Sequence, residues 1–150
     1  MKSISFCVQK FWLLIALVTI GIYSQSCNKE QTLQPISEQD QTKALLTSGT
    51  WKLQSESVDG VDQTALYSKF TINFTSSNFT AVNGGAIWPI HGSWNFDGTD
   101  SKTIRRNDGT IVKISVTSAT LVMTINWTTS TLGSGKANST SGQNVFSMVK

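Results

Sequence analysis

The one histidine of the chain is the natural starting point for catalytic chemistry. His91 lies between Ile90 and Gly92, and two acids, Asp97 and Asp100, follow within ten residues. A serine, a histidine and an aspartate can together catalyse acyl transfer, but no nucleophile-elbow motif accompanies these residues. We therefore expect His91 to be a strand-end or loop residue, and we predict no catalytic residue.

Two pairs of acids could instead bind a metal ion. Asp59 and Asp62 flank Gly60-Val61, and Asp97 and Asp100 flank Gly98-Thr99. Either loop could hold calcium loosely, but neither matches the twelve-residue EF-hand pattern. Zinc requires three or four ligands, which one histidine among scattered acids does not supply. Asp-Gly is first of all a turn dipeptide. We expect neither a metal nor a cofactor.

Cys27 carries the most informative chemistry, because of what precedes it. Two lysines, Lys2 and Lys10, come before an apolar run over 11–22, and Ser24-Gln25-Ser26 leads to the cysteine. A basic start, a short apolar run and small residues are typical of a secretory signal peptide. The alternative is a transmembrane helix, but twelve residues cover only about 18 Å and a span needs about 20 residues. We predict a signal peptide over residues 1–26.

A cysteine at the first mature position resembles the lipobox of bacterial lipoproteins. The resemblance implies that the Cys27 thiol carries a diacylglycerol, which would hold the protein at a membrane. We expect a lipoprotein of the bacterial cell envelope, anchored by this lipid to the outer membrane, facing either the periplasm or the cell surface.

The remaining composition indicates one domain of nearly balanced charge and without disulfides. Loss of Lys2 and Lys10 leaves 10 basic and 9 acidic side chains in residues 27–150. A net charge of +1 gives little attraction to phosphates, so we expect no nucleic-acid partner. We also expect a monomer. A solvated strand end explains the one basic pair, Arg105-Arg106. With Cys7 removed and Cys27 acylated, packing alone must stabilise the fold.

The sequence after the cysteine divides into a tether and a folded domain. Residues 27–36 are polar and end near a proline, which indicates a flexible tether, and the domain then covers 37–150. Ser37 followed by acids is an N-cap signal, so we predict a short helix over about 38–46, ended by Gly49.

From Trp51 onward the apolar residues alternate with polar ones, and turn residues recur every eight to twelve positions. This pattern predicts eight antiparallel strands joined by short connections. They are expected over about 51–56, 70–74, 79–83, 92–96, 102–106, 112–116, 121–128 and 145–149. Such a meander can close into an all-β, up-and-down barrel, which also removes exposed edges. A two-sheet sandwich is the alternative, and its long connection could only be residues 129–143.

The segment Gly49-Thr50-Trp51 resembles the Gly-x-Trp motif that opens the first strand of lipocalins. In that fold a short helix closes the barrel and the tryptophan packs just above it. Residues 70–74, 92–96 and 114–123 are similar to stretches of the lipocalin-like domain of bacterial lipoproteins. The lipocalin disulfide and a Thr-Asp-Tyr-type second motif are missing. The resemblance implies an eight-stranded lipocalin-like barrel, with Gly49 and Trp51 in structural roles, that binds small hydrophobic molecules.

Several aromatic and apolar residues are candidates for such a ligand site. Tyr67, Met123 and Trp127 are expected to line the interior. Trp88 and Ile90 flank Pro89 in a loop, where they could rim the barrel mouth, although packing over the barrel end explains Trp88 equally well. The first functional hypothesis is therefore non-catalytic binding of a small hydrophobic or amphipathic ligand. The alternative is a filled barrel whose loops contact a protein or glycan of the envelope.

Overall fold

The computed structural model describes residues 35–129 and 140–150. The predicted signal peptide, the predicted lipidation site Cys27 and the predicted tether up to residue 34 lie outside these ranges. Within them, no helix has both the length and the apolar character needed to cross a membrane.

The predicted helix is present as α2, over Glu38–Leu46. The Ser37 hydroxyl accepts a hydrogen bond from the Asp40 backbone N–H at 3.1 Å, which satisfies one of the donors that a helix start leaves free. Glu38 and Asp40 add negative charge where the helix dipole is positive. At the other end, the Thr47 N–H donates to the Lys43 carbonyl at 2.9 Å, and the chain then turns into the first strand.

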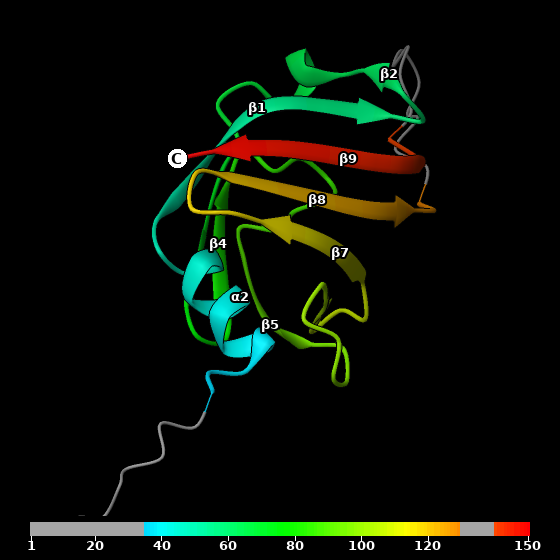
Figure 1. The fold of residues 1–150 in the computed structure, drawn as a ribbon. Helices are drawn as coiled ribbons and strands as arrows, with labels where there is room; N and C mark the ends of the chain where they lie inside the picture. Colours follow the sequence, from blue (N-terminus) through cyan, green and yellow to red (C-terminus); the bar gives the residue numbers. More distant parts are fainter. Residues whose placement is uncertain (1–34, 130–139) are drawn as a thin grey trace, which may run out of the picture. The chain divides into compact units, whose positions relative to one another are not determined.

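Eight strands form the barrel wall. They are β1 (Thr50–Val58), β3 (Thr71–Phe74), β4 (Asn78–Val82), β5 (His91–Phe96), β6 (Thr103–Arg106), β7 (Ile111–Val116), β8 (Thr120–Trp127) and β9 (Gly142–Val149). Each pairs antiparallel with the next along the chain, and β1 also pairs with β9, from Lys52 opposite Val149 to Val58 opposite Asn144. Figure 1 shows β1, β9 and β8 side by side. This closing pair confirms the barrel and excludes the sandwich.

Two short elements were not predicted. The strand β2 (Val61–Asp62) turns back on the end of β1, and the 3₁₀-helix η2 (Thr64–Tyr67) follows it. Together with residues 68–70 they make the connection between β1 and β3, which we call the 59–70 segment. This connection is longer than the barrel needs, and it positions Tyr67.

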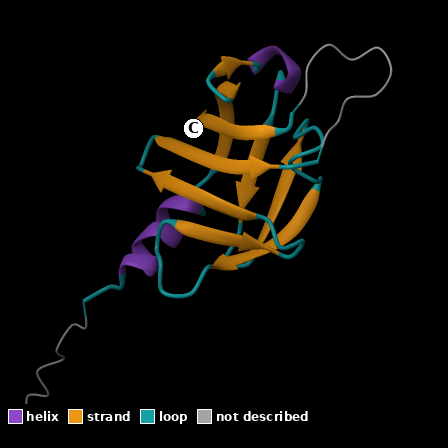
Figure 2. Ribbon diagram, turned by 90° about the vertical axis from the view of Figure 1, so that its right-hand side faces the viewer, coloured by secondary structure: helices purple, strands orange, loops and turns teal. Residues whose placement is uncertain are grey.

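The barrel has two distinct ends. At the helix end, the Gln39 side-chain amide donates to the Gly98 carbonyl at 2.9 Å, and the Ser101 hydroxyl donates to Glu38 at 3.2 Å, so α2 lies against the β5–β6 connection. The far end carries the 59–70 segment and the connections over 83–90 and 107–110, together with the end of β8 and the start of β9. Figure 2 shows α2 at one end of the barrel and η2 at the other.

The interior is packed with aromatic and aliphatic side chains, because alternate residues of each strand point inward. The largest of these that are almost fully buried are Trp51, Trp88, Tyr67, Phe70, Phe74, Phe79 and Phe146. One inward residue corrects a prediction. Arg106 is not solvated but 3% exposed, because Ile104 and Arg106 alternate inward on β6 while Arg105 points out.

Candidate functional site

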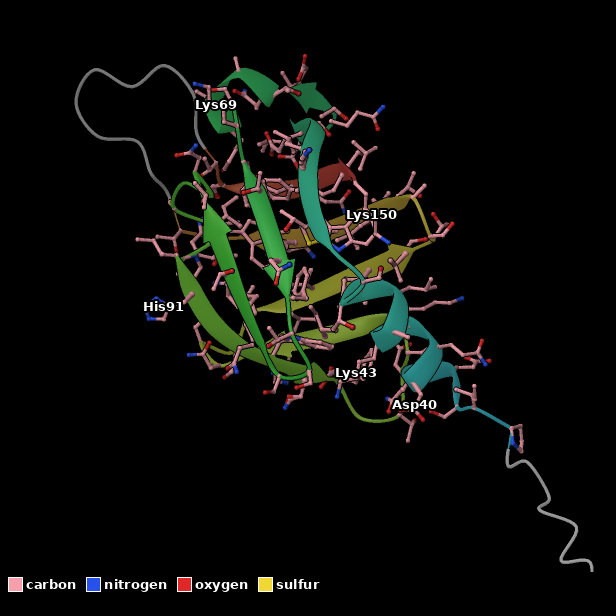
Figure 3. The ribbon with its side chains drawn as sticks, turned by 90° about the vertical axis from the view of Figure 1, so that its left-hand side faces the viewer. Asp40, Lys43, Lys69, His91 and Lys150 are labelled. Carbon is pink, nitrogen blue, oxygen red and sulfur yellow. The ribbon has the colours of Figure 1, made fainter. Side chains whose placement is uncertain are left out.

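The structure separates the residues that could have formed a catalytic triad. His91 begins β5 and is exposed, and Figure 3 shows its side chain directed away from the barrel. Asp97 and Asp100 follow the other end of the same strand, about 20 Å away at 3.3 Å per residue. There Asp97 pairs with Arg105 at 3.0 Å. Hydrogen bonds from Thr103 and from the Lys102 backbone lower the pKa of Asp100. These residues therefore share no site.

The acids beside Gly60 have structural partners. An oxygen of Asp59 accepts the Gln143 backbone N–H at 2.8 Å, which links the end of β1 to the start of β9. Asp62 accepts the hydroxyl and the backbone N–H of Thr64, and these bonds lower its pKa. In the described ranges, no three histidine, cysteine or acidic residues are grouped as metal ligands.

The structure brings together most, but not all, of the predicted ligand residues. Tyr67 and Met123 are buried in the interior, and Trp127 is partly buried against the same core. Trp88 is 2% exposed and lies among the core rings rather than on a rim. Ile90 is 77% exposed on the outer surface, so it does not join them.

Trp88 reaches the interior because its loop folds back. The Trp88 N–H donates to the Gly84 carbonyl at 3.0 Å, which closes a tight turn. Its ring then packs edge-on against Phe79 at 5.5 Å and lies 6.3 Å from Phe70. On another side, the Arg106 guanidinium lies 5.0 Å from the ring centroid, a cation–π distance.

Arg106 is held in place by polar contacts as well. Its Nη1 donates to the Ile87 carbonyl at 2.6 Å, and its Nη2 pairs with Asp108. Burial acts to raise the pKa of Asp108, but the hydrogen bonds from Arg106 and Thr110 together lower it. The arginine thus ties the 83–90 loop to the end of β6.

Glu56 is the residue that the sequence reasoning missed. Strict alternation from Trp51 and Leu53 directs Glu56 outward, but a register shift between Leu53 and Ser55 marks a β-bulge that reverses the order. Glu56 therefore points inward and is 1% exposed. The apolar residues of this strand stand at odd positions up to Leu53 and at an even position at Val58. This change along one strand was the sequence signal for the bulge.

The environment of Glu56 favours its neutral form. Burial raises the pKa of Glu56 from 4.5 to about 7, and the nearby negative charge of Asp62 adds to the rise. Its backbone lies opposite Phe146 on β9. The backbone N–H and carbonyl of Glu56 bind Thr64 and Gln63, which join the strand to the 59–70 segment. The two carboxyl oxygens have no hydrogen-bond partner among the described residues.

Further buried polar atoms near the far end also lack a hydrogen-bond partner among the described residues. Within the described ranges, seven buried side-chain atoms lack a hydrogen-bond partner. They are both carboxyl oxygens of Glu56, Tyr67 Oη, Trp88 Nε1, Trp127 Nε1, Arg106 Nε and Asn144 Oδ1. Buried polar atoms are nearly always paired in proteins, so this concentration at one end of a small barrel needs a reason. We call these six residues the far-end polar cluster.

Tyr67 is the member of this cluster that the 59–70 segment supplies. Its ring packs edge-on against Phe146 at 5.1 Å and lies 6.4 Å from Phe70. Burial raises its pKa, and the charge of Glu56 raises it further. Gly85 makes the close fit possible, because a Cβ there would lie 2.9 Å from the tyrosine ring.

The interior has no spare room next to these rings. Phe70, Met123 and Phe146 expose none of their surface. A side chain with no exposed surface has no water-sized void beside it, so the barrel is filled at these positions. A ligand could reach Glu56 only by replacing a side chain that now covers it.

The Gly-x-Trp residues have structural surroundings. Trp51 is fully buried, and its indole N–H donates to the Leu46 carbonyl at 2.9 Å, so the ring packs directly on the end of α2. Lys150 lies over the ring at 4.7 Å from its centroid. Gly49 sits in the turn between α2 and β1, where a Cβ would meet only the flexible Lys150 side chain. The tryptophan thus anchors the helix to the barrel.

Compared with protein-family models, curated protein sequences and solved structures, the chain matches none.

Proposed function

We propose that this chain is a lipid-anchored, lipocalin-like lipoprotein of the bacterial envelope that binds one small amphipathic molecule, without catalysis, at the far end of its barrel. The observation that carries this proposal is the far-end polar cluster. Leaving a buried donor or acceptor unpaired costs about 1–3 kcal/mol, so several such atoms together substantially lower the free energy of unfolding of a domain of this size. A ligand with polar and apolar parts would pair with some of these atoms.

The 59–70 segment is the element that would make room. Its ends contain the positive-φ residues Asp59, Gly60 and Lys69, and only Tyr67 of η2 is buried. Withdrawal of Tyr67 would expose one large side chain, at about 2 kcal/mol, and would open the space between Phe70, Phe146 and Glu56. An amphipathic ligand filling that space would recover the lost burial.

The ligand proposal is tested by native mass spectrometry of the full chain, purified from the membranes of its own host. We expect a co-purifying small molecule on part of the wild-type protein. Tyr67→Ala should raise the occupied fraction, because it creates space without touching the barrel wall. Protein of bare mass in both forms, together with no uptake of an apolar fluorescent dye by either, would refute ligand binding.

The anchor is tested separately. We expect the wild-type chain to partition into the detergent phase of a Triton X-114 extraction. Cys27→Ser should shift it to the aqueous phase or block its processing, because the thiol that receives the lipid is lost. Aqueous partitioning of the processed wild-type chain would refute the lipid anchor.

A second function is favoured by a different observation. Four large apolar side chains at the far end are exposed, namely Val61, Leu66, Val82 and Ile90. Exposed apolar side chains on loops at one end are typical of surfaces that contact a partner. Contact of a filled barrel with an envelope protein or glycan would be supported if Leu66→Ser or Ile90→Ser abolished cross-linking to one defined neighbour in cells.

A further inference from the structure

The far-end polar cluster contains a buried carboxyl group, that of Glu56, without a cationic partner among the described residues. In the described part of the chain, ion pairs join Arg105 to Asp97 and Arg106 to Asp108, and none involves Glu56. An ionised carboxylate that is 1% exposed and unpaired is strongly unfavourable. The group that would best stabilise the buried Glu56 carboxylate is therefore a cation or a strong hydrogen-bond donor.

Glu56 lies beside an aromatic cluster. Phe146 lies opposite Glu56 on the neighbouring strand, and it contacts Tyr67 at 5.1 Å, Phe70 at 5.5 Å and Trp88 at 6.4 Å between ring centroids. Aromatic faces attract cations, and one already does so here, since the Arg106 guanidinium lies 5.0 Å from the Trp88 centroid. A carboxylate beside such rings suits a positive charge attached to an apolar body.

Other ligand classes fit these residues less well. A metal ion needs several oxygen or nitrogen ligands, and the described residues include no group of three. An anionic ligand would meet the repulsion of Glu56 and Asp62. A neutral apolar ligand would leave the carboxyl oxygens unpaired.

We propose that the far end of the barrel binds an amphipathic amine, whose ammonium group pairs with Glu56 and whose apolar body takes the place of Tyr67 against Phe70, Phe146 and Trp88. This inference rests on the proposed ligand-binding function and specifies its ligand class.

The proposal predicts a pH dependence. With the pKa of Glu56 near 7, the bound ammonium must displace a proton below pH 7 but not above it. Apparent affinity should therefore fall about tenfold between pH 8 and pH 6. Among the other charged groups at this end, Asp59 binds Gln143, Asp62 binds Thr64, and Arg106 pairs with Asp108. Lys69 and His91 also lie at this end and are exposed, so the Glu56→Gln variant is needed to assign the pH dependence to Glu56. The Tyr67 phenol stays neutral across this range, because its pKa is raised.

The test uses the full chain and three probes of one shape: phenylethylamine, phenylethanol and 3-phenylpropanoate. Binding is measured by isothermal titration calorimetry at pH 6, 7 and 8. We expect phenylethylamine to bind at least tenfold more tightly than the other two at pH 8. Glu56→Gln should abolish that preference and the pH dependence, while Glu56→Asp should retain a preference for the amine.

Glu38→Gln is the matched control, because it removes an acid at the helix end, and it should bind like the wild type. Circular dichroism of each variant reports folding, and if Glu56→Gln does not fold, the wild-type pH series and Glu56→Asp decide the question. Equal binding of phenylethylamine and phenylethanol, unchanged amine binding in Glu56→Gln, or no binding of the amine would each overturn the inference. The ligand-binding proposal is judged independently, by the co-purifying mass and dye uptake.

Discussion

The two ends of this barrel are built in opposite ways from similar residues. At the helix end, the Trp51 indole donates to Leu46, and the side chains of Gln39 and Glu38 bind the β5–β6 connection. At the far end, the indoles of Trp88 and Trp127 have no hydrogen-bond partner in the described ranges. The Trp51 indole N–H at one end is thus hydrogen-bonded, and those of Trp88 and Trp127 at the other end are buried without a partner among the described residues.

This difference separates an end that stabilises the barrel from an end with unpaired polar atoms. The helix end is what a small domain without a disulfide needs, since packing and hydrogen bonds there must hold the closed sheet. The far end retains unpaired polar atoms that well-packed apolar residues could replace without loss. We infer that the helix end is the structural foundation, and the far end is where the proposed ligand would bind.

The largest expected effect is at the helix end. Trp51→Ala should lower the free energy of unfolding by about 4 kcal/mol, because it leaves a large cavity and an unpaired Leu46 carbonyl. Urea unfolding followed by circular dichroism measures this. Trp51→Phe is the milder control. A loss below about 1 kcal/mol in the alanine variant would contradict the assignment of this end as the foundation.

The next prediction compares the losses of stability in alanine variants of two adjacent arginines, one buried and one half-exposed. Arg106→Ala should cost about 3 kcal/mol, because it removes a buried cation that holds the Ile87 carbonyl, Asp108 and the Trp88 ring. Arg105→Ala breaks only a half-exposed ion pair with Asp97 and should change stability by less than about 1 kcal/mol. Urea unfolding of both variants gives the difference, and equal losses would show that Arg106 is not the anchor of the 83–90 loop.

The architecture could be predicted because it depends on local patterns. Alternation of apolar and polar residues sets which face of a strand is buried, and Ser37 marks the helix start by its capping chemistry alone. Barrel closure followed from the need to bury one apolar face of a meander. Each of these signals lies within a few residues along the chain, so one sequence was enough.

The candidate site could not be predicted in the same way, because it depends on exceptions to those patterns. The bulge before Ser55 reverses the face of Glu56, and the folded-back loop carries Trp88 inward. Arg106 is buried because rings and a carbonyl from distant segments surround it. These contacts are set by tertiary structure, and no local spacing indicates them.

The far end should also make the protein sensitive to pH. Because the pKa of Glu56 is raised from 4.5 to about 7, the folded state holds a proton that the unfolded state releases in this range. Stability should therefore be full below pH 4.5 as far as Glu56 is concerned, and should fall by about 2 kcal/mol as pH rises through 7. Urea unfolding at pH 5, 6, 7 and 8 measures the slope. Glu56→Gln should remove it, and an equal slope in that variant would assign the effect to another group.

The smallest expected effect is the most direct test of the difference between the ends. Tyr67→Phe removes a hydroxyl that is buried without a partner among the described residues, so the free energy of unfolding should stay the same or rise by up to about 1 kcal/mol. Ser37→Ala removes a single polar atom at the helix end, where that atom caps α2, and should cost about 1 kcal/mol. Changes of opposite sign in the free energy of unfolding, measured with urea, would mean that polar groups stabilise the helix end and destabilise the far end. A loss in Tyr67→Phe as large as that in Ser37→Ala would mean that the Tyr67 hydroxyl has a stabilising partner, and the case for a ligand at the far end would lose one of its supports.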